Sequence, residues 1–306
     1  MSAKQGLLPL VAAGVTMTLW ASAFIAIRVV GADYSPGALA LGRLSVGAIV
    51  LSAVAAVRPV RVPRGRPLLL VLAYGVLWFG VYAVLVNAAE HHLDAGTTAL
   101  VVNVGPIFIV VLAGIYLQEG FPRGLVTGLA IAFAGVTTIA VATSTGRHDA
   151  TGVLLALGAA ALYAVGVLLQ KQALRTVDPF SATWLGCVAG AVACLPFAPA
   201  LIDEVGGAPA AATAGVVYLG VFPTAVAFAT WSYALARTSA GKLGSSSYLV
   251  PALAVAMSWA VLDEVPGPLA LAGGALCLVG VALTRLPSRH AARPPRGRRA
   301  AVARSG

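Results

Sequence analysis

Charged side chains are scarce in this sequence. They make up 10% of its 306 residues, whereas soluble domains carry about 25%. Hydrophobic residues reach 59%, and they gather in runs long enough to cross a bilayer, which takes about 20 mostly apolar residues. The shortage of charge excludes an ordinary soluble domain and predicts an integral membrane protein.

Cysteines are few and the common catalytic motifs are missing. The chain has 3 cysteines, Cys187, Cys194 and Cys277, all within apolar runs, so we expect no disulfide framework. It contains no nucleotide-binding loop, no nucleophile–base constellation and no zinc spacing. We therefore expect no enzyme activity, cofactor or metal. The net charge of +10 lies mostly in two short stretches beside apolar runs and does not indicate a nucleic-acid partner.

Ten apolar segments are predicted to cross the membrane. They lack the alternation of barrel strands over roughly 10 residues, so helices are expected. The first segment is too long for a signal peptide and has no cleavage-type sequence, so we expect it to be retained. The predicted spans are residues 8–31, 35–57, 67–89, 95–117, 122–143, 151–174, 179–202, 210–236, 239–262 and 267–286.

The second half of the sequence repeats the first. Four residues of the first half, Pro106, Glu119, Gly128 and Gly135, recur 145 positions later as Pro251, Glu264, Gly273 and Gly280. This period is far longer than the roughly 50 residues of a solenoid unit. The pattern predicts two five-helix repeats, residues 1–145 and 146–286, followed by a basic tail at 287–306.

Loop charges predict that the two repeats are inverted. Each repeat holds five spans, an odd number, and matched loops carry opposite charge: Arg58 and Arg61 lie after the second span, whereas Asp203 and Glu204 lie after the seventh. Cytoplasmic loops collect Lys and Arg, so both termini are expected in the cytoplasm. The excess of 17 arginines over 3 lysines favours a high-GC genome and a bacterial plasma (inner) membrane.

The inverted halves, the stretch from Trp20 to Phe24 and the paired Pro-then-Glu pattern resemble the drug/metabolite transporter superfamily, and more narrowly its EamA-type members, over roughly residues 8–286. The resemblance implies ten helices around a central cavity and export of small metabolites, amino acids or toxic compounds by alternating access. One departure is that Gly120 follows Glu119, whereas Val265 follows Glu264.

Paired residues near the repeat interface are candidates for hinges and gates. Pro106 and Pro251 each remove a backbone donor within a span, so we interpret them as hinges rather than tolerated kinks. Glu119 and Glu264 close their spans, either as a gate or proton site or as structural carboxylates tying helix ends together. No acidic residue lies near the centre of a predicted span, which disfavours a mechanism built on a deep carboxylate.

Several polar and aromatic residues are candidates for contact with a substrate. Arg43 is the deepest charge; it either binds an anionic group or pairs structurally with carbonyls. The aromatic candidates could line a cavity or face lipid, and the small polar ones could line a cavity or serve close helix packing. The predicted substrate-binding set is Trp20, Arg43, Trp78, Tyr82, Asn103, Tyr163, Ser246 and Tyr248.

Charged groups near the spans receive simpler interpretations. Arg28 is expected to extend toward the membrane surface. Glu90, His91, His92 and Asp94 are expected to form a solvated loop, because neighbouring residues on a helix point about 100° apart and no third metal ligand is placed. The arginine-rich tail is expected to be disordered and to rest on anionic lipid.

The sequence thus favours a secondary transporter, an exporter of a small molecule, acting as a monomer or homodimer in the bilayer. Two other classes stay open: an intramembrane enzyme that modifies a lipid or isoprenoid, and a non-transporting membrane scaffold. The enzyme would need a buried acid, base, nucleophile or metal cluster, which the sequence does not supply convincingly.

Overall fold

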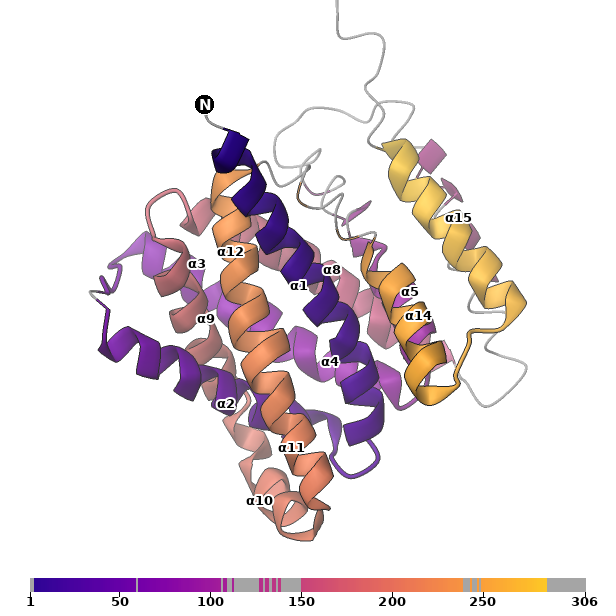
Figure 1. Ribbon diagram of the computed structural model, residues 1–306, viewed down its shortest axis with the longest axis horizontal. Helices are drawn as coiled ribbons and strands as arrows, with labels where there is room; N and C mark the ends of the chain where they lie inside the picture. Colours follow the sequence, from indigo (N-terminus) through magenta and orange to yellow (C-terminus); the bar gives the residue numbers. More distant parts are fainter. Residues whose placement is uncertain are drawn as a thin grey trace, which may run out of the picture.

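The computed structural model describes residues 3–58, 60–105, 150–238 and 249–284, with isolated residues between 107 and 138 and at 243 and 247. Every element in this part of the chain is helical (Figure 1), which confirms the predicted all-α class. The elements are α1 (Ala3–Val30), α2 (Pro36–Ala56), α3 (Arg66–Tyr74), η1 (Gly75–Val81), α4 (Tyr82–Glu90), α5 (Ala95–Val102), α8 (Ala150–Ala173), α9 (Pro179–Ala193), η2 (Leu195–Phe197), α10 (Ala198–Gly207), α11 (Ala210–Leu219), η3 (Gly220–Val226), α12 (Ala227–Arg237), α14 (Leu249–Leu262) and α15 (Pro268–Thr284).

Five helical stretches are long and apolar enough to cross a bilayer. They are Leu7–Val30, Pro36–Ala56, Arg66–Glu90, Ala150–Ala173 and Ala210–Arg237, and a bent pair adds a sixth if it counts as one span. Most of the predicted fifth span and parts of the fourth and ninth lie outside the described residues, so the total of ten stays a prediction. The same holds for the tail.

The seventh predicted span is broken rather than continuous. α9 ends at Ala193, and the following stretch, Leu195–Gly207, is bent by 49° from it. Pro196 and Pro199 stand at the break. A proline inside a helix lacks the N–H for the backbone ladder and crowds the preceding turn, which explains why the helix changes direction here.

Two spans contain a wide helical turn at matching places. η1 and η3 are π-helical segments of 7 residues each, and the start of η3 at Gly220 lies 145 positions after the start of η1 at Gly75, the same offset that relates the two repeats. π segments inside α-helices are often found at functional sites. Each here faces glycine on its neighbour: Gly186 and Gly190 of α9 approach η1, and Gly47 of α2 approaches η3.

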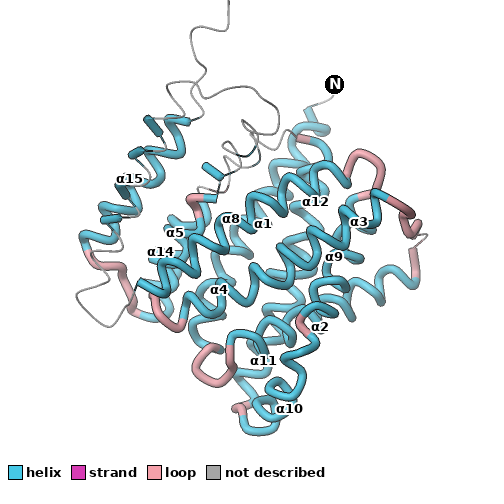
Figure 2. Tube along the Cα trace, turned by 180° about the vertical axis from the view of Figure 1, so that it is seen from behind, coloured by secondary structure: helices cyan, strands magenta, loops and turns pink. Residues whose placement is uncertain are grey.

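Helices of the two predicted repeats pack closely together. α1 contacts α12 and α14, α2 contacts α9 and η3, and α4 contacts α8. Figures 1 and 2, which view the molecule from opposite sides, both show α1 running beside α12. Many buried interface positions are alanine, such as Ala21 and Ala156. Small side chains allow the close helix approach that membrane bundles rely on.

The two ends of the bundle differ in charge. One end, the basic end, carries Arg58, Arg61, Arg64, Arg66, Lys171, Arg175 and Arg237. The opposite end, the acidic end, carries Asp33, Glu90, Asp94, Asp203, Glu204, Asp263 and Glu264. Hydrogen bonds connect different helices at each end. At the basic end, Lys171 Nζ donates to the carbonyls of Leu235 and Thr238 at 2.7 and 2.9 Å. At the acidic end, Glu204 accepts from the Ser35 N–H at 2.9 Å.

Candidate functional site

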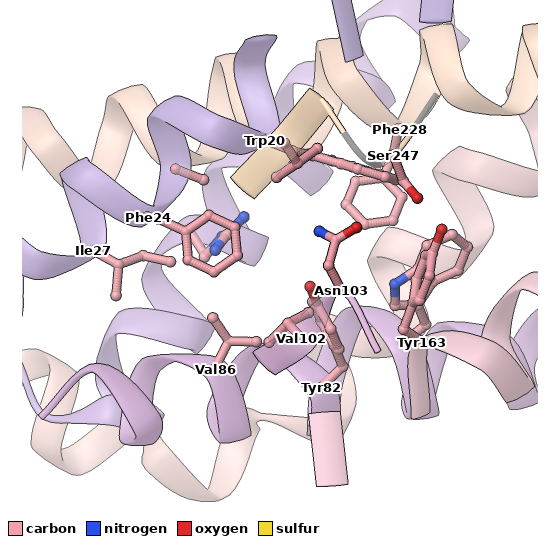
Figure 3. Close-up of a pocket in the computed structure, with 14 residues that line it drawn as sticks. Trp20, Phe24, Ile27, Tyr82, Val86, Val102, Asn103, Tyr163, Phe228 and Ser247 are labelled. Atoms are coloured by element: carbon pink, nitrogen blue, oxygen red, sulfur yellow. The ribbon is translucent and has the colours of Figure 1, made fainter. Parts of the chain in front are cut away.

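A small cavity of about 60 Å³ lies between the two predicted repeats. At roughly 30 Å³ per water molecule, it has room for about two waters. Its walls come from α1, α2, α5, α8, α12 and α14 and from the span that contains η1. Figure 3 shows the lining side chains as sticks. The lining residues are Trp20, Ala23, Phe24, Ile27, Arg43, Trp78, Tyr82, Val86, Val102, Asn103, Tyr163, Phe228, Ser247 and Val250.

Aromatic rings form one wall of this central cavity. Trp78 of η1 stands edge-to-face against Tyr163 and Phe228, with ring centroids 5.4 and 5.2 Å apart. Trp20 packs against Trp231 at 5.0 Å and against Phe228 at 5.3 Å. Such pairs contribute about 0.5–1.5 kcal/mol each beyond their buried area. Because the rings hold one another in place, the wall is preorganised before any ligand arrives.

Asn103 supplies an amide to the cavity just after α5 ends. Asp94 caps that helix, its carboxylate accepting the Thr97 N–H at 2.8 Å. Figure 3 shows the Asn103 side chain projecting between Trp20 and Tyr82. Asn103 Oδ1 and Trp20 Nε1 are buried without a hydrogen-bond partner among the described residues. An unsatisfied buried polar group costs about 1–3 kcal/mol, which a water or ligand in the cavity would recover.

Arg43 brings a positive charge to the cavity from α2. Its side chain is 8% exposed, and its Nε–H donates to Thr224 Oγ1 in η3 at 3.1 Å. Thr224 in turn donates to the Leu219 carbonyl at 2.8 Å. Within the described part of the chain Arg43 has no carboxylate partner. A guanidinium has five N–H donors, so this one keeps donors available for an anionic group.

Six of the eight predicted substrate-binding residues line this one cavity: Trp20, Arg43, Trp78, Tyr82, Asn103 and Tyr163. Ser246 and Tyr248 lie outside the described residues, although their neighbour Ser247 lines the cavity. Pro106 and Glu119 also lie outside them. Pro251 is buried near the start of α14, next to the lining residue Val250. The roles predicted for these residues stay predictions.

A second cavity, of about 420 Å³, lies at the acidic end and is here called the vestibule. Its lining residues are Ile27, Arg28, Val29, Gly31, Ala32, Glu90, His91, Leu262 and Glu264. Arg28 Nη2 pairs with Glu264 Oε1 at 3.1 Å, and Arg28 Nη1 donates to the backbone carbonyl of Glu90 at 3.2 Å. Arg28 is therefore engaged with the end of α4 and with the segment after α14; that it extends toward the membrane surface stays a prediction.

Glu90 does not belong to a solvated loop, so that expectation was wrong. It is the last residue of α4 and only 3% exposed, because α4 ends beneath Arg28 rather than in solvent. His91 beside it is exposed. Partial burial and the charges of His92 and Arg28 lower the pKa of His91 below its usual value. Asp94, the N-cap of α5, is partly buried.

Three of the residues that sequence reasoning missed at these sites are informative. Phe228 lines the central cavity and Trp231 packs against Trp20. They lie three residues apart and so on one face of a helix, a spacing that would have grouped them. Glu90 was missed because hydropathy places it at a span end without telling which way the side chain points.

Comparison with known proteins gives concordant matches. The EamA-like transporter family matches residues 7–141 and 150–286. The chain is 39% identical to the "Probable terminal-alkyne amino-acid exporter" of Streptantibioticus cattleyicolor, over 88% of this chain and 90% of that protein. It is 27% identical to the "Probable amino-acid metabolite efflux pump" of Salmonella typhimurium, over 92% of this chain and 94% of that protein. A solved crystal structure shares the fold with a TM-score of 0.64 and 21% identity, over 92% of this chain and 98% of that one.

Proposed function

Because the chain belongs to the EamA-like transporter family, it is an integral membrane transporter of small molecules, and we propose that it is a secondary exporter of amino-acid-like metabolites. The relatives described above are named as an amino-acid exporter and an amino-acid metabolite efflux pump. The proposal extends that substrate class to this chain and adds that transport proceeds by alternating access.

The observation that carries the substrate class is the chemistry of the central cavity. Arg43 offers guanidinium donors with no carboxylate partner among the described residues, which suits the carboxylate of an amino acid. Asn103 Oδ1 is an unused acceptor and the aromatic wall offers ring faces, both of which suit an ammonium group. The apolar residues Phe24, Ile27 and Val86 lie together in Figure 3 and suit an aliphatic side chain.

The size of the cavity supports alternating access. With room for about two waters, a volume of about 60 Å³ is too small for an amino acid. A substrate could therefore occupy it only after the walls move apart. The paired π segments η1 and η3 and the predicted hinges at Pro106 and Pro251 are the places in each repeat where we propose that the helices flex.

The charge of the two ends supports the orientation. Cytoplasmic loops are enriched in Lys and Arg, so we place the basic end in the cytoplasm, with both termini, and the acidic end outside. In a bacterial inner membrane this orientation makes the vestibule the exit route of an exporter.

Counterflow in proteoliposomes tests the proposal. Proteoliposomes that contain the purified full-length protein and are loaded with one unlabelled amino acid should accumulate the same amino acid, labelled, from outside. Arg43→Gln should lose this exchange, whereas Arg58→Gln should keep it, because Arg58 is an exposed arginine at the basic end that stacks on Phe180. The proposal fails if no member of a panel of amino acids and their apolar analogues exchanges, and if a cysteine at Asn103 never changes its accessibility.

A further inference from the structure

Glu90 carries a carboxyl group that the proposed substrate site does not use. Both of its oxygens are buried, and neither has a hydrogen-bond partner among the described residues. Its backbone carbonyl, by contrast, accepts a hydrogen bond from Arg28 Nη1 at 3.2 Å. The Arg28 side chain therefore already lies beside Glu90 while its Nε and Nη2 donate to Glu264 at 3.2 and 3.1 Å.

Charged groups on several elements act on Glu90. Arg28 on α1, Arg43 on α2, Asp94 before α5 and Glu264 after α14 act on it electrostatically, and the exposed His91 adjoins it in sequence. Glu90 lines the vestibule together with Arg28, and the charge of Arg43 in the central cavity also acts on it. The two cavities are neighbours, because Ile27 lines both.

Burial decides the state of this carboxyl. Removing an ionised carboxylate from water is very costly unless it is paired and hydrogen-bonded, and the group otherwise takes up a proton instead. In the conformation described here Glu90 has no donor to satisfy a charge, so the neutral acid is the stable form. When Glu90 loses its proton, the charge must gain a partner, and Arg28 is the cation already in contact with the residue.

We propose that Glu90 is a proton-binding site that controls the vestibule, and that protons are therefore the ion coupled to export. The coupling rests on the proposed function. In the protonated state Arg28 pairs with Glu264 and holds α1 against the segment after α14. Loss of the proton toward the basic end, through the central cavity, leaves a Glu90 carboxylate that draws Arg28 from Glu264 and opens the way from the vestibule past Ile27.

The direction of the switch fits an exporter. With Glu90 ionised, the vestibule is open, substrate leaves, and a hydronium ion from the outer solution returns the proton to the carboxylate. Protonation restores the Arg28–Glu264 pair and closes the vestibule. When the central cavity then opens toward the basic end, the proton leaves on that side and the cycle exports substrate in exchange for a proton.

Infrared spectroscopy tests the proton site without reference to transport. A pH titration of the purified full-length protein should show a protonated carboxyl band that disappears as the pH rises. The band should be absent in Glu90→Gln and present in Asp33→Asn, because Asp33 is an exposed carboxylate of the same end. A band that persists in Glu90→Gln, or no titrating band at all in the unaltered protein, overturns the proposal even if amino acids are transported.

Cysteine labelling tests the control of the vestibule. The Ile27→Cys variant in nanodiscs is treated with a polar maleimide, and its labelling rate is measured. The labelling ratio is this rate divided by the labelling rate of the exposed Ala32→Cys, which removes the pH dependence of the thiol. The ratio should rise with pH, approaching tenfold per unit because one proton is linked to opening. When Glu90→Gln is added to Ile27→Cys, the labelling ratio should be low at every pH. When Asp33→Asn is added instead, the labelling ratio should rise with pH as before.

Glu264→Gln keeps the test decisive if Glu90→Gln does not fold. It removes the competing partner of Arg28, so the labelling ratio should be high already at low pH. Counterflow that depends on sodium ions but not on pH, or a ratio that still rises with pH in Glu90→Gln, contradicts the proposal. Loss of counterflow with the infrared and labelling results intact contradicts only the proposed substrate.

Discussion

Arg43 has no charged counterpart in the second repeat. Near the start of each half the repeats are offset by 143, so the counterpart of Arg43 is Gly186. Gly186 packs against the Tyr74 side chain and carries no charge, whereas Arg43 reaches Thr224. The cavity is therefore cationic on the side of α2, where Arg43 lines it, so a substrate with two unlike ends would bind in one orientation.

Substitutions at Arg43 and Thr224 separate a substrate contact from a structural role. We expect Arg43→Lys and Arg43→Gln to weaken the apparent affinity for substrate about tenfold or more, because a hydrogen bond to a charged group contributes about 1.5–3 kcal/mol. Thr224→Val removes the support of the guanidinium and the Thr224 hydrogen bond to the Leu219 carbonyl, but leaves the guanidinium itself, and should cost less affinity. Counterflow measured at several substrate concentrations gives the affinities. Should expression and Tm fall first while affinity is unchanged, Arg43 is structural.

The orientation of the buried Glu90 side chain could not be predicted from the sequence. Six substrate candidates were found because polar and aromatic residues are rare in this chain, and those within spans are conspicuous. The orientation of Glu90 depends on the packing of α4 against Arg28 on another helix. No local pattern encodes that contact, since the two residues lie 62 positions apart.

At the scale of elements, the π segments are a feature that hydropathy does not reveal. The third and eighth spans were predicted as residues 67–89 and 210–236, and the structure gives Arg66–Glu90 and Ala210–Arg237. Their extents were predictable because a bilayer sets the length of an apolar run. The wider turn within each was not, because hydropathy does not report the register of helical hydrogen bonds; η1 packs on α9 and η3, which contains Pro223, packs on α2. Nor was the break after α9, although Pro196 and Pro199 could have indicated it.

The packing of η1 on α9 makes a prediction about glycine. A methyl group at Gly186 would overlap the Tyr74 side chain, so we expect Gly186→Ala to destabilise the protein by about 1–3 kcal/mol and to lower Tm in detergent. Gly206 of α10 has no neighbour near such a methyl group. Gly206→Ala should therefore leave Tm unchanged or raise it slightly, since alanine favours helix. Equal Tm values for both variants would show that the close packing contributes nothing.

At the scale of the whole molecule, charge is sorted by end. Apart from Asp178, which caps α9, the acidic residues that the structure describes lie at the acidic end, and the loop arginines lie at the other. The sequence predicted this sorting, because loop charges alternate along the chain independently of how the helices pack. What it could not predict is that Arg28, a cation at the acidic end, pairs there with Glu264.

Cysteine labelling of the two ends tests the orientation. Asp33→Cys at the acidic end and Arg61→Cys at the basic end are both exposed. In intact cells an impermeant maleimide should label Asp33→Cys and spare Arg61→Cys, and inverted vesicles should give the reverse. The parent protein is the control, since its described cysteines, Cys187, Cys194 and Cys277, are buried. Labelling of Arg61→Cys in intact cells would reverse the orientation, and with it the exit route through the vestibule.

The bend after α9 has a consequence for the surrounding lipid. At about 1.5 Å per residue, the 15 residues of α9 reach only about 22 Å, less than the hydrocarbon thickness of about 30 Å. The bilayer beside α9 must therefore thin, or α10 must tilt to fill the difference, and either adjustment costs free energy in proportion to the mismatch. Acyl-chain length thereby becomes a variable of the transport cycle: any state that straightens the bend is favoured in thick membranes and disfavoured in thin ones.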